Sequence, residues 1–391
     1  MAQKLKFGNG TWATKEGSTL AYSDTNNAFK PLPFTTTRNS IATRVNKQGL
    51  IEVVGNDIPR IDYTDSAEGV LLLEPSRTNL ITSKVSDWTA FNSSTTQSNE
   101  SPDGYNNAVK ITSTAIVNSG VYLNGLSVTG NTEIFTIWLK GENGGEILEI
   151  GDATNRTTVT LTNEWVRYEA KKTSASSFKI LYNQTTNPII QTWYAWGAQL
   201  EDNVSYPTSY IPTSGSTVTR QADTANGSGN SEVFNDSEGV LFLNTASLVD
   251  SDTPRAISIS DGTISNRIYI YYSTSNGIEV GVKVLGTDQA AFSSTLTDST
   301  LFSKIAIKFK VNDFSLWING FEVGSDLLGS IFTANTLTEL AFDLGNNSND
   351  FYGKTKELGY YDEILTEEEL EYLTSYRSLN ELVTELNLNT L

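Results

Sequence analysis

Short runs of alternating apolar and polar residues recur along most of this chain, and turns rich in Gly, Asn, Asp and Ser separate them. Side chains two residues apart share one face of a strand, so each run predicts a strand with one buried face. The clearest runs are 101–113, 133–145, 163–172, 266–274, 277–286 and 304–324, the last being a hairpin around an Asn-Asp turn. Such a pattern is typical of antiparallel β-sandwiches.

The segment 193–220 begins with a strand that is apolar on both faces. One face carries Trp193, Ala195 and Gly197, and the other carries Tyr194, Trp196, Ala198 and Leu200. Because both faces need cover, we expect the central strand of a sandwich, with its tryptophans in the core. Pro207 and Pro212 then end the pairing, and Tyr206 and Tyr210 are expected to hold the exit loop against the module.

Two short helices are predicted at the C-terminus, because Thr366 with Glu369 and Ser378 with Glu381 have the spacing of capping boxes. The second helix carries an apolar stripe of Leu379, Leu382, Val383 and Leu386. This stripe either packs back onto the preceding sandwich or forms a short oligomerisation helix. The first alternative is favoured, since two heptads are too few to form a trimer alone.

The composition of the 391-residue chain narrows the function classes. Binding of phosphates needs clustered Lys and Arg, so the formal charge of −18 argues against nucleic acid as a partner. The absence of Cys and His excludes disulfides, thiolate metal sites and mechanisms that depend on histidine. No apolar run has the length of a membrane span and the N-terminus lacks a signal-peptide core, so we expect neither membrane insertion nor export.

The segment 193–220 also resembles a signature of bacteriophage tail-fibre and other virion proteins. In those proteins a carbohydrate-binding-module-like jelly roll ends in WGAQLE, a variable turn, TSYIPTSG and TR, and here these letters run from Trp196 to Arg220. Residues 38–80, with ATRVNKQGLIEVV, PRIDY and LLLEPSRTNLI, resemble a segment that often precedes this jelly roll. The resemblance covers most of residues 38–220 and implies a virion structural protein.

A second resemblance is to concanavalin A-like (laminin-G-like) jelly rolls, through EGVLF, KIAIKFKVNDFSLWINGFEV and FYGKTKELGYYDEILTEEEL in that order. The predicted fold class is therefore all-β, with two antiparallel jelly-roll β-sandwiches in tandem, a small N-terminal β region and short C-terminal helices. The expected domains are an N-terminal β and virion-attachment region at 1–80, the carbohydrate-binding-module-like jelly roll at 81–213, a polar linker at 214–235, the concanavalin A-like sandwich at 236–365 and helices at 366–391.

Aromatic side chains on the polar face of a strand are the candidates for glycan binding, because exposed rings stack on sugar faces. Trp138 and Trp317 both alternate with apolar neighbours in this way. Tyr269 and Tyr271 share a strand face with Arg267, and a concave face that these three form with Trp317 would suit a glycan. The alternative is that these aromatic residues belong to a subunit interface or a second buried layer.

No cofactor is expected, and no residue is a catalytic candidate, because no acidic pair stands out among the carboxylates. Asp250 with Asp252, or the loop 346–350, could offer oxygen ligands to a structural Ca²⁺. Both resembled families often carry such an ion, which is what the resemblance implies. Polar loops of this kind are otherwise solvated turns.

The favoured hypothesis is a non-enzymatic phage virion fibre protein, on the tail or the head, that is assembled in the host cytoplasm and displayed on the virion. It would bind host cell-surface polysaccharide as a homotrimer and contact other virion proteins. The alternative is a structural head-decoration or adaptor protein whose jelly rolls make protein–protein contacts. A polysaccharide depolymerase is the third hypothesis, and the missing histidine counts against it.

Overall fold

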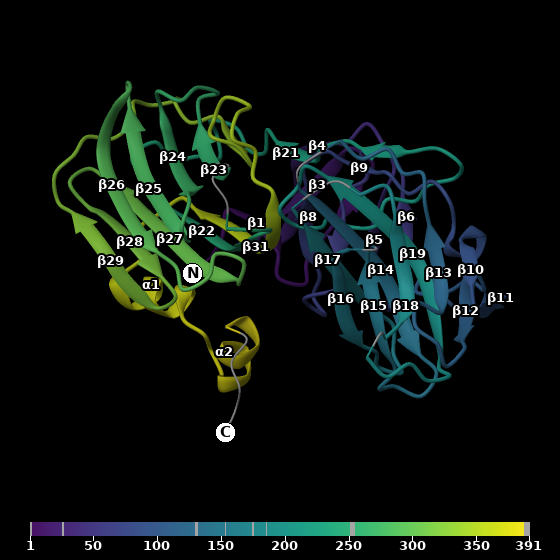
Figure 1. Ribbon diagram of the computed structural model, residues 1–391. Helices are drawn as coiled ribbons and strands as arrows, with labels where there is room; N and C mark the ends of the chain where they lie inside the picture. The colour runs from purple at the N-terminus through teal and green to yellow at the C-terminus, as the bar shows by residue number, and fades with distance from the viewer. Residues whose placement is uncertain are drawn as a thin grey trace. The chain divides into compact units, whose positions relative to one another are not determined.

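The structure is a computed structural model that describes residues 2–25, 27–129, 132–152, 154–173, 176–184, 186–250 and 255–386. Antiparallel strands and two short helices group into two compact units (Figure 1). Unit 1 consists of Met1–Asn39, Gly55–Pro75 and Ala222–Leu391, and unit 2 of Ser40–Val54 and Ser76–Gln221. The all-β fold class with antiparallel sandwiches that the alternating pattern predicts is confirmed.

Unit 2 contains two five-stranded antiparallel sheets in the part of the chain that is described. One sheet has the order β11 (Ser93–Asn99), β12 (Ala108–Ser113), β19 (Thr192–Asp202), β14 (Glu133–Gly141) and β17 (Val166–Lys172). The other has the order β10 (Thr89–Phe91), β13 (Gly120–Leu123), β18 (Lys179–Asn183), β15 (Ile147–Gly151) and β16 (Arg156–Thr160). The strand pairs β5 (Ala42–Val45) with β6 (Ile51–Val54) and β9 (Arg77–Asn79) with β20 (Val218–Arg220), and the 3-10 turn Val85–Asp87, complete the unit.

The strand β19 is central in its sheet, as predicted, but a bulge at Gly197 changes which of its residues share a face. Gly197 has a φ of 64°, and the register with β14 shifts beside it. Ala198 and Leu200 therefore join Trp193 in the core of the sandwich, while Trp196 points to the opposite face. The prediction that Ala198 and Leu200 lie on the face of Trp196 was wrong, because strict alternation assumes an unbroken strand.

Unit 1 is built on a large antiparallel sheet to which twelve described strands contribute. Its main path is β21 (Thr224–Asn226), β4 (Ala28–Thr37), β3 (Ser18–Ser23), β1 (Leu5–Gly8), β31 (Gly353–Tyr361), β22 (Glu238–Ser247), β27 (Ser303–Lys310), β28 (Phe314–Ile318) and β29 (Phe321–Asp326). Off this path, β2 (Thr14–Lys15) pairs with β3, and β7 (Ile61–Asp62) pairs with β8 (Val70–Leu73), which pairs with β31. A second sheet, of β26 (Thr287–Thr295), β25 (Gly277–Val284), β24 (Arg267–Tyr272), β23 (Arg255–Ser260) and β30 (Glu339–Ala341), packs on its inner face.

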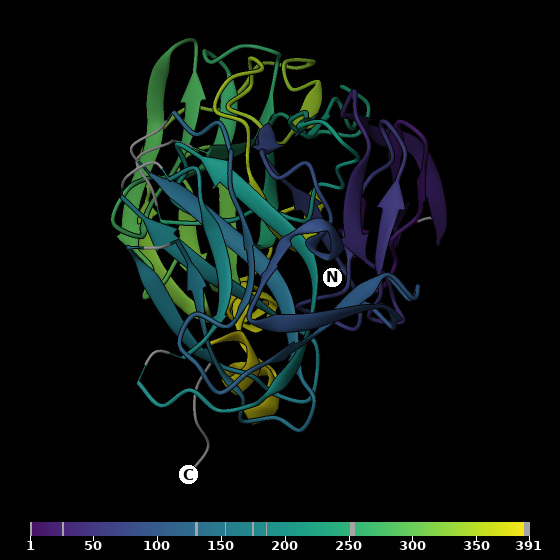
Figure 2. The same ribbon diagram turned by 45° about the vertical axis from the view of Figure 1, so that its right-hand side comes forward.

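The N-terminal strands belong to the sandwich of unit 1, and Figure 2 shows them in purple. β1 pairs along β31 from Leu5 opposite Tyr360 to Gly8 opposite Glu357. Without β1 and β8, one edge of β31 would present unpaired backbone groups. The N-terminal β region expected at 1–80 thus reaches the sheet of unit 1 through β1, and pairing with a strand more than 300 residues away leaves no signal in local alternation.

The predicted linker 214–235 is likewise part of the folded units. It contains β20 and β21, and its side chains Val233 and Phe234 are buried in the core of unit 1. The chain passes from unit 2 to unit 1 at Gln221 and Ala222. Its Ser, Thr, Gly and Asn content reflects turns between very short strands rather than a flexible spacer.

A buried cluster of charges joins three separate segments of unit 1. Arg60 bridges two acids, with its Nη1 2.6 Å from Oε2 of Glu74 and its Nη2 paired with Asp223. Arg38 Nη1 lies 3.0 Å from the other oxygen of Asp223. All four side chains are buried, so each charge depends on its partners for solvation. The segments PRIDY, LLLEPS and TRQAD therefore each contribute a charged side chain to this buried cluster.

The helix α1 (Glu367–Thr374) packs back onto the outer face of the large sheet. Its side chains Leu370 and Leu373 contact Trp317 and Tyr361 within one cluster, and the capping box of Thr366 and Glu369 is present. The helix α2 (Leu379–Glu385) has no buried residue: Leu379 is 66% exposed, and Leu382, Val383 and Leu386 are half-buried. The favoured alternative, in which this apolar stripe packs back onto the sandwich, is therefore met only in part. Neither described helix is long and apolar enough to span a bilayer.

Candidate functional site

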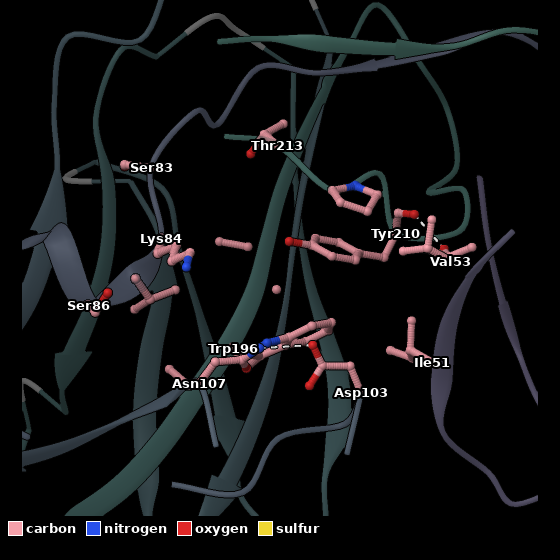
Figure 3. Close-up of a pocket in the computed structure, with 16 residues that line it drawn as sticks. Ile51, Val53, Ser83, Lys84, Ser86, Asp103, Asn107, Trp196, Tyr210 and Thr213 are labelled. Carbon is pink, nitrogen blue, oxygen red and sulfur yellow. Dashed lines mark hydrogen bonds between the residues drawn. The ribbon is translucent and has the colours of Figure 1, made fainter. Parts of the chain in front are cut away.

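A cavity of about 200 Å³ opens in unit 2 beside the bulge of β19 (Figure 3). Two aromatic side chains, Trp196 and Tyr210, line it together with polar Asp103, Asn107 and Lys84. Sites for drug-sized ligands have volumes of roughly 300–1,000 Å³, so this cavity has room for a single ring or the end of a chain. It is the feature of unit 2 that combines enclosure, aromatic surface and polar groups.

The loop that carries Tyr210 is fixed by buried polar side chains of β19. Gln199 Oε1 accepts a hydrogen bond from the backbone N–H of Ile211 at 2.6 Å, and Glu201 Oε1 accepts from that of Thr208 at 2.9 Å. Burial raises the pKa of Glu201, and the hydrogen bond from the Thr208 N–H opposes that effect. The contacts give a physical reason why WGAQLE and TSYIPTSG occur together: the first segment anchors the second.

Trp138 does not line the cavity. It is half-buried, and its ring packs edge-on against Trp196 and Tyr210 with centroid separations of 5.6 and 5.9 Å. The Arg167 guanidinium lies 4.6 Å from the centre of the Trp138 ring. A Cβ atom at Gly197 would come within 3.1 Å of this ring, so the glycine is needed for both the bulge and the packing. The residue predicted as a binding platform therefore supports the two rings that line the cavity.

The polar side of the cavity is held in a tight turn. Asp103 Oδ1 accepts a hydrogen bond from the Ser101 hydroxyl at 2.6 Å, and its Oδ2 accepts from Nδ2 of Asn107 at 2.9 Å. The Tyr210 hydroxyl points into the cavity, and Lys84 and Asp103 lie on different sides of it (Figure 3). Burial, and then the negative charge of Asp103, raise the pKa of Tyr210 to about 12.

This set of groups suits a ligand ring that is apolar on its faces and polar at its edge. Aromatic rings attract such faces, while Asp103 and Asn107 can accept and donate hydrogen bonds to hydroxyl groups. Hydrolysis of a glycosidic bond needs two carboxylates on either side of the bond, and Asp103 is the one carboxylate in this cavity wall.

Ligand affinity is expected to stay constant through the pH range in which an ordinary tyrosine ionises, near its usual pKa of about 10. Tyr210 keeps its proton there because its pKa is raised to about 12. Affinities measured at about pH 7.5 and about pH 10.5 test this expectation, with Tyr210→Phe as the control. A fall in affinity near pH 10 that disappears in Tyr210→Phe would contradict it.

The candidates predicted in the second sandwich do not meet on one face. Trp317 is 6% exposed and packs against α1, which agrees with the alternative of a second buried layer, and its role in glycan binding stays a prediction. Tyr269 and Tyr271 are half-buried on the outer face of the other sheet, beside buried Arg267, whose guanidinium lies 4.7 Å from the Tyr269 ring. The concave face expected from these four residues is therefore not formed, and glycan binding by Tyr269 and Tyr271 stays a prediction.

The expectation of a structural Ca²⁺ ion falls partly outside the described residues and stays a prediction. Asp252 lies outside the described residues, and Asp250 Oδ1 accepts from the backbone N–H of Asn276 at 2.9 Å. At the loop 346–350, the nearby Asp343 accepts hydrogen bonds from backbone N–H groups of the same loop. Ca²⁺ takes 6–8 oxygen ligands, and no three Asp or Glu side chains in the described ranges cluster for a metal.

Sequence reasoning missed Trp196 and Tyr210 because both belong to a segment with clear structural roles. The usable signal was Gly197: a glycine next to a tryptophan inside a strand pattern indicates a bulge, and bulges redirect side chains beside functional sites. The role of Asp103 had no comparable signal, since Pro-Asp-Gly is an ordinary turn.

No protein-family model matches this chain, and no significant match was found among curated proteins. Solved structures similar to part of it include the Ruminococcus gnavus IT-sialidase CBM40, at 14% identity and TM-score 0.32, covering 36% of this chain and 85% of that one. Domain 4 of AbnA, a GH43 extracellular arabinanase from Geobacillus stearothermophilus in complex with arabinotriose, is similar at 12% identity and TM-score 0.31, covering 44% and 84%. The Bacillus licheniformis beta-glucanase is similar at 11% identity and TM-score 0.26, covering 37% and 73%. These likenesses are partial and of low identity.

Proposed function

We propose that this chain is a non-enzymatic phage virion fibre protein and that the cavity of Trp196 and Tyr210 binds a sugar residue of a host-surface glycan. One observation carries the binding role: two aromatic rings meet Asp103 and Asn107 in a cavity with room for one ring. Aromatic faces supply affinity for a sugar face, and the polar pair selects hydroxyl positions.

The virion assignment rests on the resemblance of residues 38–220 to phage virion proteins. Residues of the resembling segments shape the site, because Gln199 and Glu201 of WGAQLE position the loop that carries Tyr210. As a fibre, the chain would form a homotrimer, contact other virion proteins and be assembled in the host cytoplasm. Electron microscopy of particles carrying the protein would test its location and its copy number together.

A second candidate function, a head-decoration or adaptor protein, is favoured by a different observation. Phe321, Leu327 and Leu328 are strongly exposed at and just after β29, which is an edge strand of the large sheet. Exposed apolar groups at a sheet edge are typical of protein–protein contacts. Under this alternative, the virion location would hold and no glycan would bind. A polysaccharide depolymerase is less favoured, because the cavity wall has one carboxylate.

Binding to a printed array of bacterial capsule and lipopolysaccharide glycans tests the proposal, with Asp103→Asn as the variant. A hydrogen bond to a charged group contributes about 1.5–3 kcal/mol, so we expect binding to weaken by roughly 10- to 100-fold. The matched control is Glu169→Gln, which removes an exposed carboxylate outside the cavity and should leave binding unchanged. Equal binding by Asp103→Asn and the unchanged chain would refute the site.

A further inference from the structure

A second cavity, of about 340 Å³, lies on the outer face of the large sheet of unit 1. Its floor comes from β1, β22, β27 and β31, and its cover comes from α1, α2 and the residues between them. Figure 1 shows the two helices, in yellow, following β31 at the end of this unit. The volume falls in the range of about 300–1,000 Å³ that small-molecule sites occupy. The cavity shares no lining residue with the site of unit 2.

Two buried amide oxygens in the wall of this cavity have no hydrogen-bond donor among the described residues. Gln3, 4% exposed, donates through Nε2 to Glu357 Oε1 at 3.2 Å and to the Tyr361 hydroxyl at 3.0 Å. A carboxylate can only accept, so Nε2 must face Glu357 and Oε1 is left as an acceptor with no donor among the described residues. Asn244 is 8% exposed, and its buried Oδ1 likewise has no hydrogen-bond donor among the described residues. Buried acceptors without donors are rare in native proteins, which points to a missing partner.

The sheet register places these amides in an ordered polar row. Asn244 is directly opposite Lys304 on one neighbouring strand and Glu357 on the other. Residues directly opposite in a sheet are separated by about 4.5–5.5 Å, so one ligand can contact all three. Gly359 makes room for the Gln3 amide, because a Cβ there would lie 2.7 Å from Gln3 Nε2.

Charges of both signs surround this row. The lining residues Asp24, Glu357 and Glu381 carry negative charge, and the lining residues Lys6, Lys304 and Arg377 carry positive charge. Carboxylates and amide oxygens accept hydrogen bonds from hydroxyl groups, whereas ammonium and guanidinium groups donate to hydroxyl oxygens. A neutral ligand whose hydroxyls both donate and accept matches this mixture better than an anion or a cation does. Tyr372, 54% exposed, adds an aromatic face at the cavity.

We infer that this cavity is a second carbohydrate-binding site, which takes a neutral, hydroxyl-rich sugar ring on unit 1. The inference goes beyond the proposed function, which assigns binding to unit 2. The sugar hydroxyls supply the donors that Gln3 Oε1 and Asn244 Oδ1 lack. Two sites on one chain would allow bivalent attachment to a polysaccharide, which increases avidity without new contacts at either site.

Ligand-observed saturation-transfer NMR on the full chain tests this site with glucose, galactose, mannose and N-acetylglucosamine as probes. The measurement uses the Trp196→Ala background, so that the cavity of unit 2 does not contribute. We expect at least one probe to bind and Asn244→Leu, added to that background, to weaken its binding at least tenfold. Gly359→Ala should act in the same direction, because its methyl group displaces the Gln3 amide and Gly359 does not have a positive φ.

Thermal unfolding distinguishes a binding role from a structural one. Asn244→Leu removes a buried amide oxygen that has no hydrogen-bond donor among the described residues. The melting temperature should therefore stay equal or rise while sugar binding is lost. If no probe binds the Trp196→Ala chain, or if Asn244→Leu leaves binding unchanged, the cavity holds only water and the inference is wrong. Neither result affects the proposed function, which fails only if the unit 2 variants keep full glycan binding.

Discussion

Replacing Arg60 with alanine is expected to lower the free energy of unfolding by about 3–5 kcal/mol. Arg60 is fully buried and pairs with both Glu74 and Asp223, so its loss leaves two carboxylates in a dry interior with reduced compensation. Removing one member of a buried ion group costs this much because the remaining charge cannot regain its hydration. Urea unfolding followed by fluorescence measures the change.

The matched control is Lys4→Ala, in the same unit. Lys4 pairs with Asp362 at 2.8 Å, but the two side chains are 26% and 34% exposed, and such pairs contribute roughly 0–1 kcal/mol. Arg60→Lys is a second informative variant, since one ammonium group cannot reproduce the two-sided pairing of the guanidinium. Equal unfolding free energies for Arg60→Ala and Lys4→Ala would show that the buried cluster does not stabilise unit 1.

Replacing Trp196 with alanine is expected to weaken glycan binding by more than about 100-fold, because it removes the largest apolar surface of the cavity. The change also removes packing against Trp138 and Tyr210, so some loss of stability accompanies it. Trp165→Ala separates the two effects. Trp165 packs against the same cluster of side chains without lining the cavity.

Binding to the glycan array and the unfolding transition should be measured for both tryptophan variants. The account predicts that both variants lose stability and that only Trp196→Ala loses binding. Similar losses of binding in the two variants would mean that the cluster acts as a structural core and not as a ligand surface.

Local patterns predicted much of the fold. Apolar residues on both faces identified β19 as a central strand, and the capping box of Thr366 and Glu369 identified α1. Long-range pairing was not accessible in this way. β1 pairs with β31 across nearly the whole chain, and no periodicity within either strand records its partner. The N-terminal region and the polar segment 214–235 were therefore assigned outside the sandwich to which most of them belong.

The sequence pattern pointed to outward-facing aromatic residues, but not to the two that line the cavity. Alternation correctly placed Trp138 and Trp317 opposite the main cores, but an outward face can be covered by another layer. α1 covers Trp317, and Trp196 with Tyr210 lies over Trp138. Alternation also places Trp196 opposite Trp193, but the one-residue bulge that follows it depends on backbone conformation at Gly197 rather than on hydrophobic pattern.

A crystal structure of the chain with the strongest-binding oligosaccharide from the array tests the central claim most directly. The account predicts one sugar ring in the cavity of unit 2, with a face against Trp196 or Tyr210 and hydroxyls within hydrogen-bond distance of Asp103 and Asn107. An oligosaccharide bound elsewhere on the chain, with this cavity empty, would contradict it.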